Sequence, residues 1–234
     1  PIYVSATLAT GANVETAFAP FLMEMGRTFR DRPVDTFLAD SPFDYATQAV
    51  LYTPHDAPAF DRNGDVDEYA RELVAATRPL LLANEGHAFI LFTSRRDLIA
   101  YENALGESDY PYPILSQCSS EQVRTRGASL FKRTPHATLL GLRTFFEGVD
   151  VPGLGLSLVI IPKLPFALPS AVLEAKRARY EDRFAGFRAV DVPVMLRDLR
   201  QMVGRLIRSV DDRGVVAVLD PRLHTKANDA ADVA

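Results

Sequence analysis

The residues best suited to chemistry lie near the carboxyl end, in the run Gln201-Met202-Val203-Gly204-Arg205-Leu206-Ile207-Arg208. The segment from about Val194 to Ser209 has apolar residues at helical spacing, which predicts a helix. At roughly 100° per residue, Gln201, Arg205 and Arg208 fall within about 60° of one another on its polar face. Two guanidinium groups and an amide on one stripe suit the recognition of a triphosphate. A solvated basic face is the alternative.

A second candidate is the tripeptide Phe92-Thr93-Ser94, which ends a strongly apolar run. Ser94 is expected to open a helix, and hydroxyl groups beside free N–H groups at a helix N-terminus form a ready anion site. A phosphate of a nucleic-acid strand is one candidate occupant. The alternative is that Ser94 serves only as a helix N-cap.

A third candidate is the segment Gly141–Gly153, which contains Thr144, Glu147 and Asp150. At the carboxyl end of a strand, these side chains could meet phosphate, ribose or an arginine of a partner. Gly148 and Gly153 have the spacing of a phosphate-binding P-loop. Leu154-Gly155 follows where Lys and Ser or Thr are required, so this segment is not a P-loop.

Composition excludes several other classes of site. The chain has 234 residues, one cysteine and a net charge of -4, so no global basic field attracts nucleic acid. The single Cys118 excludes a disulfide framework and a four-cysteine zinc or iron–sulfur site in this chain. The four histidines lack metal-ligand spacing, and no metal site is expected. No apolar run is long enough to span a membrane, so we expect a cytoplasmic chain with no membrane partner.

Strands should alternate with helices of 12 or more residues, which predicts an α/β/α layered fold with a mostly parallel central sheet. We expect strands at Ile2–Val4, Gln48–Tyr52, His87–Thr93, Pro113–Leu115, Thr138–Leu140, Leu156–Ile161 and Val215–Leu219. We expect helices at about Asn13–Met25, Asp65–Asn84, Ser94–Gly106, Ser120–Lys132, Pro169–Phe184 and Val194–Ser209. Ligands of such sheets bind at the carboxyl ends of strands, so the loops after Phe92, Leu140 and Ile161 are candidates by position.

Several runs taken together resemble the motifs of DinG/XPD-type helicases of superfamily 2. Ser5-Ala6-Thr7-Leu8 resembles motif III, Leu91-Phe92-Thr93-Ser94 motif IV, Glu147-Gly148-Val149-Asp150 motif V and Gln201–Arg208 motif VI. The run Val215–Leu223 is similar to the strand that closes the second motor domain of the family. The motifs occur in the family's order across nearly the whole chain, and the match is closer to bacterial DinG-type proteins than to XPD.

The resemblance implies a RecA-like lobe of a 5′-to-3′ ATP-dependent DNA helicase that acts in DNA repair. It implies that Arg205 and Arg208 contact the γ-phosphate of ATP and that Gln201 helps to couple ATP to DNA. Glu147, Gly148 and Asp150 would lie at the nucleotide cleft. By the same resemblance Thr93, Ser94 and Thr144 would touch the backbone of single-stranded DNA.

The departures from the family are equally informative, because the Walker A lysine motif and the acidic Walker B motif are missing. The chain therefore resembles the second motor lobe, at residues 41–224, preceded by the end of the first lobe at 1–40 and followed by a flexible tail at 225–234. ATP and Mg²⁺ are expected only in the full-length enzyme, with a missing first lobe as partner.

We expect that this chain alone does not hydrolyse ATP. The alternatives are a non-catalytic nucleic-acid or nucleotide-binding module derived from a helicase lobe, and a motor that acts on RNA, since backbone contacts alone do not distinguish the sugar.

Overall fold

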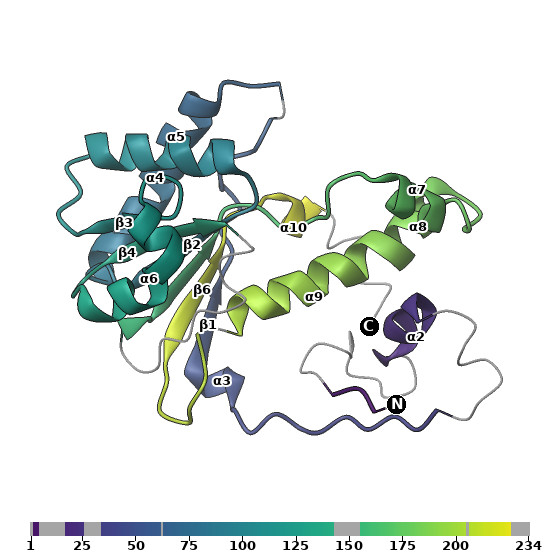
Figure 1. Cartoon of the computed structure of the whole chain (residues 1–234). Helices are drawn as coiled ribbons and strands as arrows, with labels where there is room; N and C mark the ends of the chain where they lie inside the picture. Colours follow the sequence, from purple (N-terminus) through teal and green to yellow (C-terminus); the bar gives the residue numbers. More distant parts are fainter. Residues whose placement is uncertain are drawn as a thin grey trace. The chain divides into compact units, whose positions relative to one another are not determined.

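The computed structural model describes residues 2–4, 17–25, 34–61, 63–142, 155–204 and 206–225. The chain divides into two compact units (Figure 1). Unit 1 comprises Pro1–Pro42 and Pro165–Gln201, and unit 2 comprises Phe43–Leu164 and Met202–Ala234. No helix within the described ranges is both long and apolar enough to cross a membrane.

Unit 2 is built on a six-stranded sheet whose order is β1-β6-β5-β2-β4-β3. Its strands are β1 (Ala49–Tyr52), β2 (Ala88–Phe92), β3 (Ile114–Ser116), β4 (Thr138–Leu142), β5 (Leu158–Ile161) and β6 (Gly214–Val218). All five neighbouring pairs are parallel. The carboxyl ends of the strands consequently meet at one edge of the sheet, and the loops that follow β2, β5 and β6 lie next to one another.

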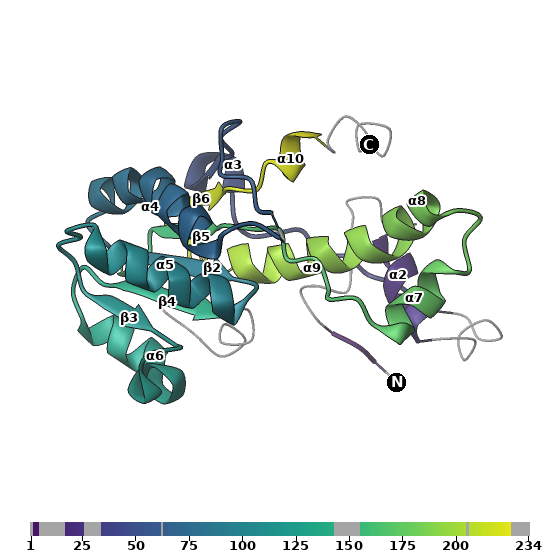
Figure 2. The same ribbon diagram turned by 90° about the horizontal axis from the view of Figure 1, so that it is seen from above.

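Helices cover both faces of this sheet, as Figure 2 shows. The two helices α4 (Val66–Ala83) and α5 (Arg95–Glu107) pack on one face, and α6 (Glu121–Arg133) packs on the other. Two short helices complete the unit, α3 (Tyr45–Gln48) before β1 and α10 (Arg222–Thr225) after β6. The three-layer RecA-like arrangement expected from the sequence is confirmed.

The central strand β2 shows why the sequence folds in this way. All five of its residues are buried, with Ile90 and Phe92 in the core cluster that also contains residues of α4 and α5. Phe89 points to the opposite face and meets Phe131 of α6, with 4.7 Å between the ring centroids. A strand buried on both faces reads as a continuous apolar run, which is the pattern of His87–Thr93 in the sequence.

The helix α4 ends in a tight turn that leads into β2. Glu85, Gly86 and His87 all have positive φ angles, of 51°, 85° and 27° respectively. A Cβ atom on Gly86 would lie only 2.0 Å from the carbonyl oxygen of His136. The turn therefore requires a glycine for both its backbone conformation and the space available.

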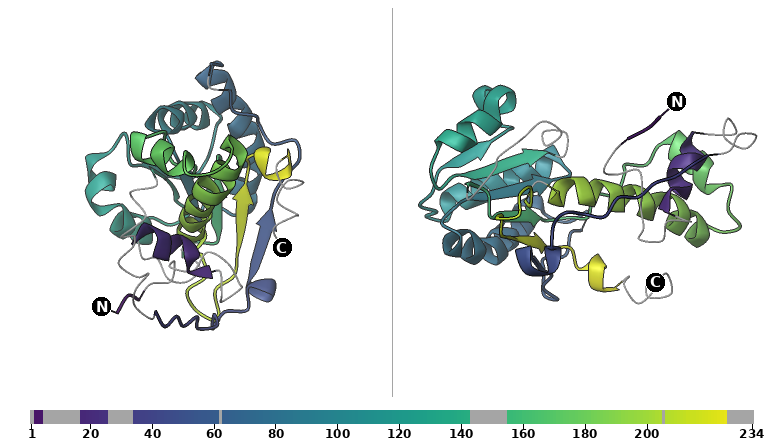
Figure 3. Two further views of the ribbon diagram at one scale, coloured as in Figure 1. Left: turned by 90° about the vertical axis from the view of Figure 1, so that its right-hand side faces the viewer. Right: turned by 90° about the horizontal axis from the view of Figure 1, so that it is seen from below.

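Unit 1 contains the helices α2 (Ala19–Glu24), α7 (Ala171–Arg177) and α8 (Arg183–Gly186), then the π-helical turn η4 (Phe187–Asp191) (Figure 3). The following helix α9 (Val192–Val203) continues into unit 2 at Met202. The half-buried side chain of Arg177 forms an ion pair with the buried Asp191 of η4. Burial of Asp191 with a guanidinium partner ties α7 to η4.

Two of the expected elements in unit 1 are wrong. Ile2–Val4 is not a strand: Ile2 and Val4 are 93% and 90% exposed, and every strand of the described sheet belongs to unit 2. The expected helix at Pro169–Phe184 is broken after Arg177, because the Asp182 side chain accepts hydrogen bonds from the amides of Phe184 and Ala185 and starts α8 anew. A carboxylate that caps a new helix competes in this way with continuation of the old one.

Candidate functional site

The junction of β2 and α5 places Thr93 and Ser94 at the carboxyl end of the central strand. Both residues are half-buried, and Ser94 is the N-cap of α5. Its hydroxyl oxygen accepts a hydrogen bond from the amide of Asp97 at 3.4 Å. The other N–H groups of the first turn of α5 point out of the helix at this edge, where they favour an anion.

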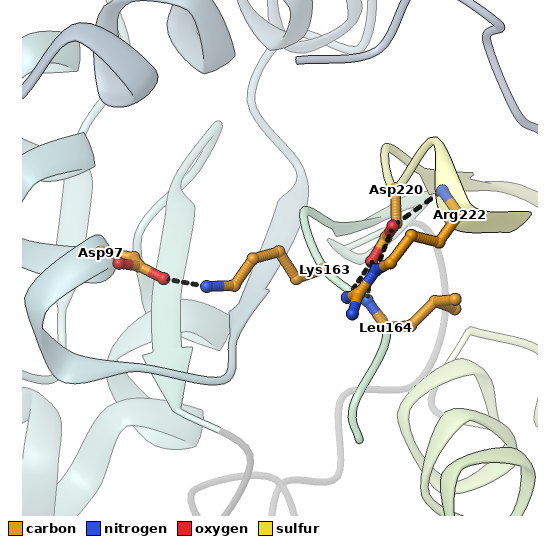
Figure 4. Close-up of polar contacts among 5 residues, drawn as sticks. All are labelled: Asp97, Lys163, Leu164, Asp220 and Arg222. Carbon is orange, nitrogen blue, oxygen red and sulfur yellow. Dashed lines mark hydrogen bonds and ion pairs between the residues drawn. The ribbon is translucent and has the colours of Figure 1, made fainter. Parts of the chain in front are cut away.

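The loop after β5 contributes Lys163 to the same edge. Its ammonium group lies 2.5 Å from a carboxylate oxygen of Asp97 in the first turn of α5 (Figure 4). The two side chains are only 13% and 5% exposed. The ammonium also lies 3.2 Å from the ring centroid of Phe60, a cation–π contact. Lys163 is therefore held by a carboxylate and an aromatic ring together.

The loop after β6 adds a second ion pair, between Asp220 and Arg222, at the same edge (Figure 4). The buried carboxylate of Asp220 accepts hydrogen bonds from the Arg222 guanidinium at 2.6 Å and from the amide of Leu164 at 2.8 Å. Burial by itself would raise the pKa of Asp220, but these hydrogen bonds and the positive charge of Arg222 lower it below its usual range. Asp220 thus fastens the β5 loop to the β6 loop.

Tyr69 of α4 lies near both ion pairs, close enough for the charges of Asp97, Asp220 and Arg222 to act on it. Its side chain is buried, and its hydroxyl group has no hydrogen-bond partner among the described residues. Burial raises the pKa of Tyr69 well above its usual value, and the carboxylates of Asp97 and Asp220 raise it further. The hydroxyl group therefore keeps its proton and remains available as a donor.

The arginine motif departs from the expected geometry. The helix α9 ends at Val203, and the amide of Leu206 donates to the Val203 carbonyl at 2.9 Å in a turn. Gly204 follows the last helical residue, a position where glycine commonly ends helices. The expectation that Gln201 and Arg208 share one helical face is therefore wrong, because Arg208 lies beyond the helix end.

A carboxylate and an amide hold the loop that contains Arg208. Asp212 accepts hydrogen bonds from the amides of Arg208 and Ser209, both at 2.8 Å. The buried side-chain amide of Gln48, just before β1, donates to the carbonyls of Ser209, Val210 and Asp212. Partial burial lowers the pKa of Arg208, while the charge of Asp212 raises it. Arg208 stays a cation in a loop fixed from two sides.

Of the residues singled out in the sequence, the structure describes four: Thr93, Ser94, Gln201 and Arg208. Thr93 and Ser94 lie together at the carboxyl edge of unit 2, and Gln201 is exposed in the last turn of α9. The remaining candidates lie outside the described residues, namely Thr144, Glu147, Gly148, Asp150 and Arg205. Within the described part of the chain, no three His, Cys, Asp or Glu side chains are grouped as metal ligands would be.

The sequence reasoning missed the two ion pairs at the carboxyl edge. Lys163 and Asp220 each follow the end of an apolar strand by two residues, which is a signal that could have identified them. Their partners Asp97 and Arg222 could not have been chosen in this way, because pairing depends on which strands are neighbours.

The chain is similar in sequence to helicases. Residues 78–231 match the helicase C-terminal domain family. The chain is 40% identical over 196 residues to the ATP-dependent DNA helicase YoaA of Escherichia coli, a match that covers 81% of this chain and 29% of YoaA. It is 31% identical over 226 residues to the ATP-dependent helicase DinG of Mycobacterium tuberculosis, which covers 96% of this chain and 32% of DinG.

The fold is similar to that of a solved XPD helicase, with a TM-score of 0.58 at 18% identity, over 80% of this chain and 34% of that one. The chain spans about a third of the length of the curated relatives it matches. The family match covers more than half of the chain. The chain therefore belongs to the helicase C-terminal domain family, in agreement with its similarity to the YoaA and DinG helicases.

Proposed function

We propose that this chain is the C-terminal motor lobe of a cytoplasmic ATP-dependent 5′-to-3′ DNA helicase of the DinG type that works in DNA repair. In this role it supplies arginine fingers to ATP bound by a first motor lobe, and it forms part of the track for single-stranded DNA. The observation that carries the proposal is the family match over residues 78–231, which includes both the β2–α5 junction and the loop of Arg208.

The nucleotide side of the proposal depends on Arg205 and Arg208. When ATP and Mg²⁺ are bound, they supply the phosphoryl group and the metal charge. Arg208 would bind an oxygen of the γ-phosphate and stabilise the charge that develops there. This role of Arg208 is supported by its loop, because Asp212 holds the backbone amide of Arg208. A side chain on a fixed backbone needs little reorganisation to bind a phosphate.

The roles of the other nucleotide-site residues depend on the motif resemblance alone. Arg205 would act beside Arg208, and Glu147, Gly148 and Asp150 would line the nucleotide cleft. Gln201 would couple ATP to DNA.

The DNA side of the proposal depends on Thr93 and Ser94, with Thr144 as a further contact implied by the resemblance. The support is that Ser94 begins a helix of 13 residues at the carboxyl end of a buried strand, where N–H groups and a hydroxyl face one edge. Contacts of this kind reach phosphates and carry no sequence information. The binding we expect is therefore independent of base sequence.

The test of the nucleotide role is Arg208→Ala in an enzyme that joins this lobe to a first lobe containing a P-loop. We expect ATP turnover to fall by about 10³- to 10⁵-fold, the range for arginine fingers in related phosphoryl transfers. Arg213→Ala is the matched control, because Arg213 is exposed in the same loop and, among the described residues, donates to the carbonyls of Val210 and Asp212. Equal turnover by the two variants would contradict the arginine-finger role.

The 234-residue chain alone should show no steady ATP turnover. Steady turnover that is unaffected by Arg208→Ala would refute this expectation. If the chain binds single-stranded DNA but a first lobe restores no turnover, the alternative of a non-catalytic binding module is favoured.

A further inference from the structure

Phe60 is an aromatic side chain that remains 40% exposed at the carboxyl edge of the sheet in unit 2. It belongs to the loop between β1 and α4, and the motifs of the sequence do not include it. Its position is fixed by two neighbours, Lys163 and Tyr69. An exposed ring that is held in place, in a loop beside the proposed phosphate contacts, requires an explanation.

Lys163 fixes the ring from one side. Its ammonium lies 3.2 Å from the ring centroid of Phe60 and 2.5 Å from a carboxylate oxygen of Asp97. The lysine side chain is only 13% exposed, and its charge is already paired. Lys163 is therefore a positioning residue for the ring rather than a contact for a phosphate group.

Tyr69 supports the ring from within the protein. The two rings meet at an interplanar angle of 78° with 5.5 Å between their centroids, which is a favourable edge-to-face geometry. Tyr69 is only 7% exposed. Because both neighbours are largely buried, they lie on the protein side of Phe60, and the exposed part of its ring faces solvent.

The hydroxyl group of Tyr69 is a hydrogen-bond donor without a partner among the described residues at this edge. It is buried, and it lies close enough to Asp97 and Asp220 for their charges to act on it. Leaving a buried hydroxyl unpaired is unfavourable, and an acceptor atom of a ligand or of an ordered water would remove that penalty.

We propose that Phe60 is a base-stacking platform for single-stranded nucleic acid, with Lys163 and Tyr69 as its positioning residues. The inference rests on the proposed function, because it adds a base contact to the phosphate contacts of Thr93 and Ser94. The two sites are linked directly: Asp97, which holds Lys163, lies in the turn of α5 that Ser94 caps. A strand whose phosphate lies at Ser94 would thus have a base near Phe60.

Stacking on an aromatic ring is tolerant of base identity and strengthens binding by about 5- to 150-fold per base. The full 234-residue chain should therefore bind a thymidine oligonucleotide at least about 5-fold more tightly than an abasic oligonucleotide of equal length. Both strands carry the same number of phosphates, so fluorescence anisotropy with the two strands separates base contacts from phosphate contacts. Phe60→Ala and Phe60→Leu should remove the preference and leave the affinity for the abasic strand unchanged.

A second test uses tryptophan fluorescence, because the unsubstituted chain contains no tryptophan. Phe60→Trp places a single indole on the platform, and its fluorescence should change with the thymidine strand and not with the abasic strand. Phe184→Trp is the matched control, since Phe184 is 49% exposed and lies 4.8 Å from the guanidinium carbon of Arg188, but in unit 1. Its fluorescence should not respond to either strand.

The outcomes separate this inference from the proposed function. The proposal that Phe60 is a base-stacking platform is wrong if Phe60→Ala and Phe60→Leu still prefer the thymidine strand over the abasic strand. It is also wrong if the fluorescence of Phe60→Trp does not change when the thymidine strand binds. The phosphate track would still stand in that case, provided that Thr93→Ala with Ser94→Ala weakens binding to both strands equally. If the unsubstituted chain binds neither strand, both ideas are overturned.

Discussion

At the scale of single residues, the edge of the sheet depends on a few buried carboxylates. Asp220 is 4% exposed and accepts hydrogen bonds from the Leu164 amide and the Arg222 guanidinium, so it joins the loops that follow β5 and β6. Asp97 performs the same task for Lys163 and α5. The residues that position this edge are therefore different from those that the motifs single out.

Replacing the carboxylate by an amide tests this role. We expect Asp220→Asn to lower the free energy of unfolding by roughly 1–2 kcal/mol near pH 7, a modest value because Arg222 is partly exposed. The pKa of Asp220 is lowered in the fold from its ordinary value of 3.8, so its charge stabilises the fold above that pH. This stabilisation is lost as the pH falls through the lowered pKa.

Urea unfolding at pH 7 and at about pH 3 measures the effect. The difference between the variant and the unsubstituted chain should shrink at the acid pH. Asp211→Asn, at an exposed position, is the control and should change little at either pH. A difference for Asp220→Asn that grows in acid would contradict the assignment.

At the scale of elements, the turns decide where strands and helices begin. The turn that joins α4 to β2 has positive φ angles at three successive residues and passes close to His136. The loop after α9 has a comparable role, because Asp212 and Gln48 fix the backbone around Arg208 where the helix has ended. The loop after α9, rather than the helix itself, thus sets the position of Arg208.

Two glycine substitutions distinguish a required turn from an ordinary helix position. Gly86→Ala should destabilise the fold by more than about 2 kcal/mol, because the residue has φ of 85° and a Cβ atom would clash with the His136 backbone. Gly106→Ala, in α5, should stabilise the fold by about 0.5–1 kcal/mol, because beyond its chain neighbours and its own helix backbone no described atom lies within 4 Å of the added Cβ. Thermal unfolding of the two variants gives the comparison, and similar melting temperatures would refute the structural reason.

At the scale of the whole molecule, the net charge bears on how this lobe can bind DNA. The chain carries a net charge of -4, so binding to DNA depends on local contacts such as the N-terminus of α5 rather than on a global field. It spans about a third of the length of the curated relatives it matches, and the proposed function assigns ATP binding to a first lobe.

Binding to single-stranded DNA should be weak, independent of sequence and sensitive to salt. Each phosphate contact should add about -0.7 to the slope of the logarithm of affinity against the logarithm of salt concentration. Anisotropy titrations from low to high salt measure this slope, and Thr93→Ala with Ser94→Ala should make it shallower. Tight binding to one duplex sequence that persists in high salt would be incompatible with the phosphate track.

The sequence by itself determined the family and the layered α/β class. Both conclusions depend on local signals, namely apolar runs, capping residues such as Ser94 and short motifs such as Gln201–Arg208. These signals act over a few residues, and so they are readable from a single chain. They also gave the sites of Thr93 and Ser94 correctly as the carboxyl end of the central strand.

Only the tertiary structure decided the strand order and the side chains that meet at the sheet edge. Asp97 and Lys163 are 66 residues apart in the chain, and they meet because β2 and β5 are neighbours in the sheet. It also showed that α9 ends at Val203, before Arg208, although the residues associated with this end, Gly204 and Asp212, are close in the chain. Contacts between distant segments depend on packing, and local sequence patterns carry no information about which segments become neighbours.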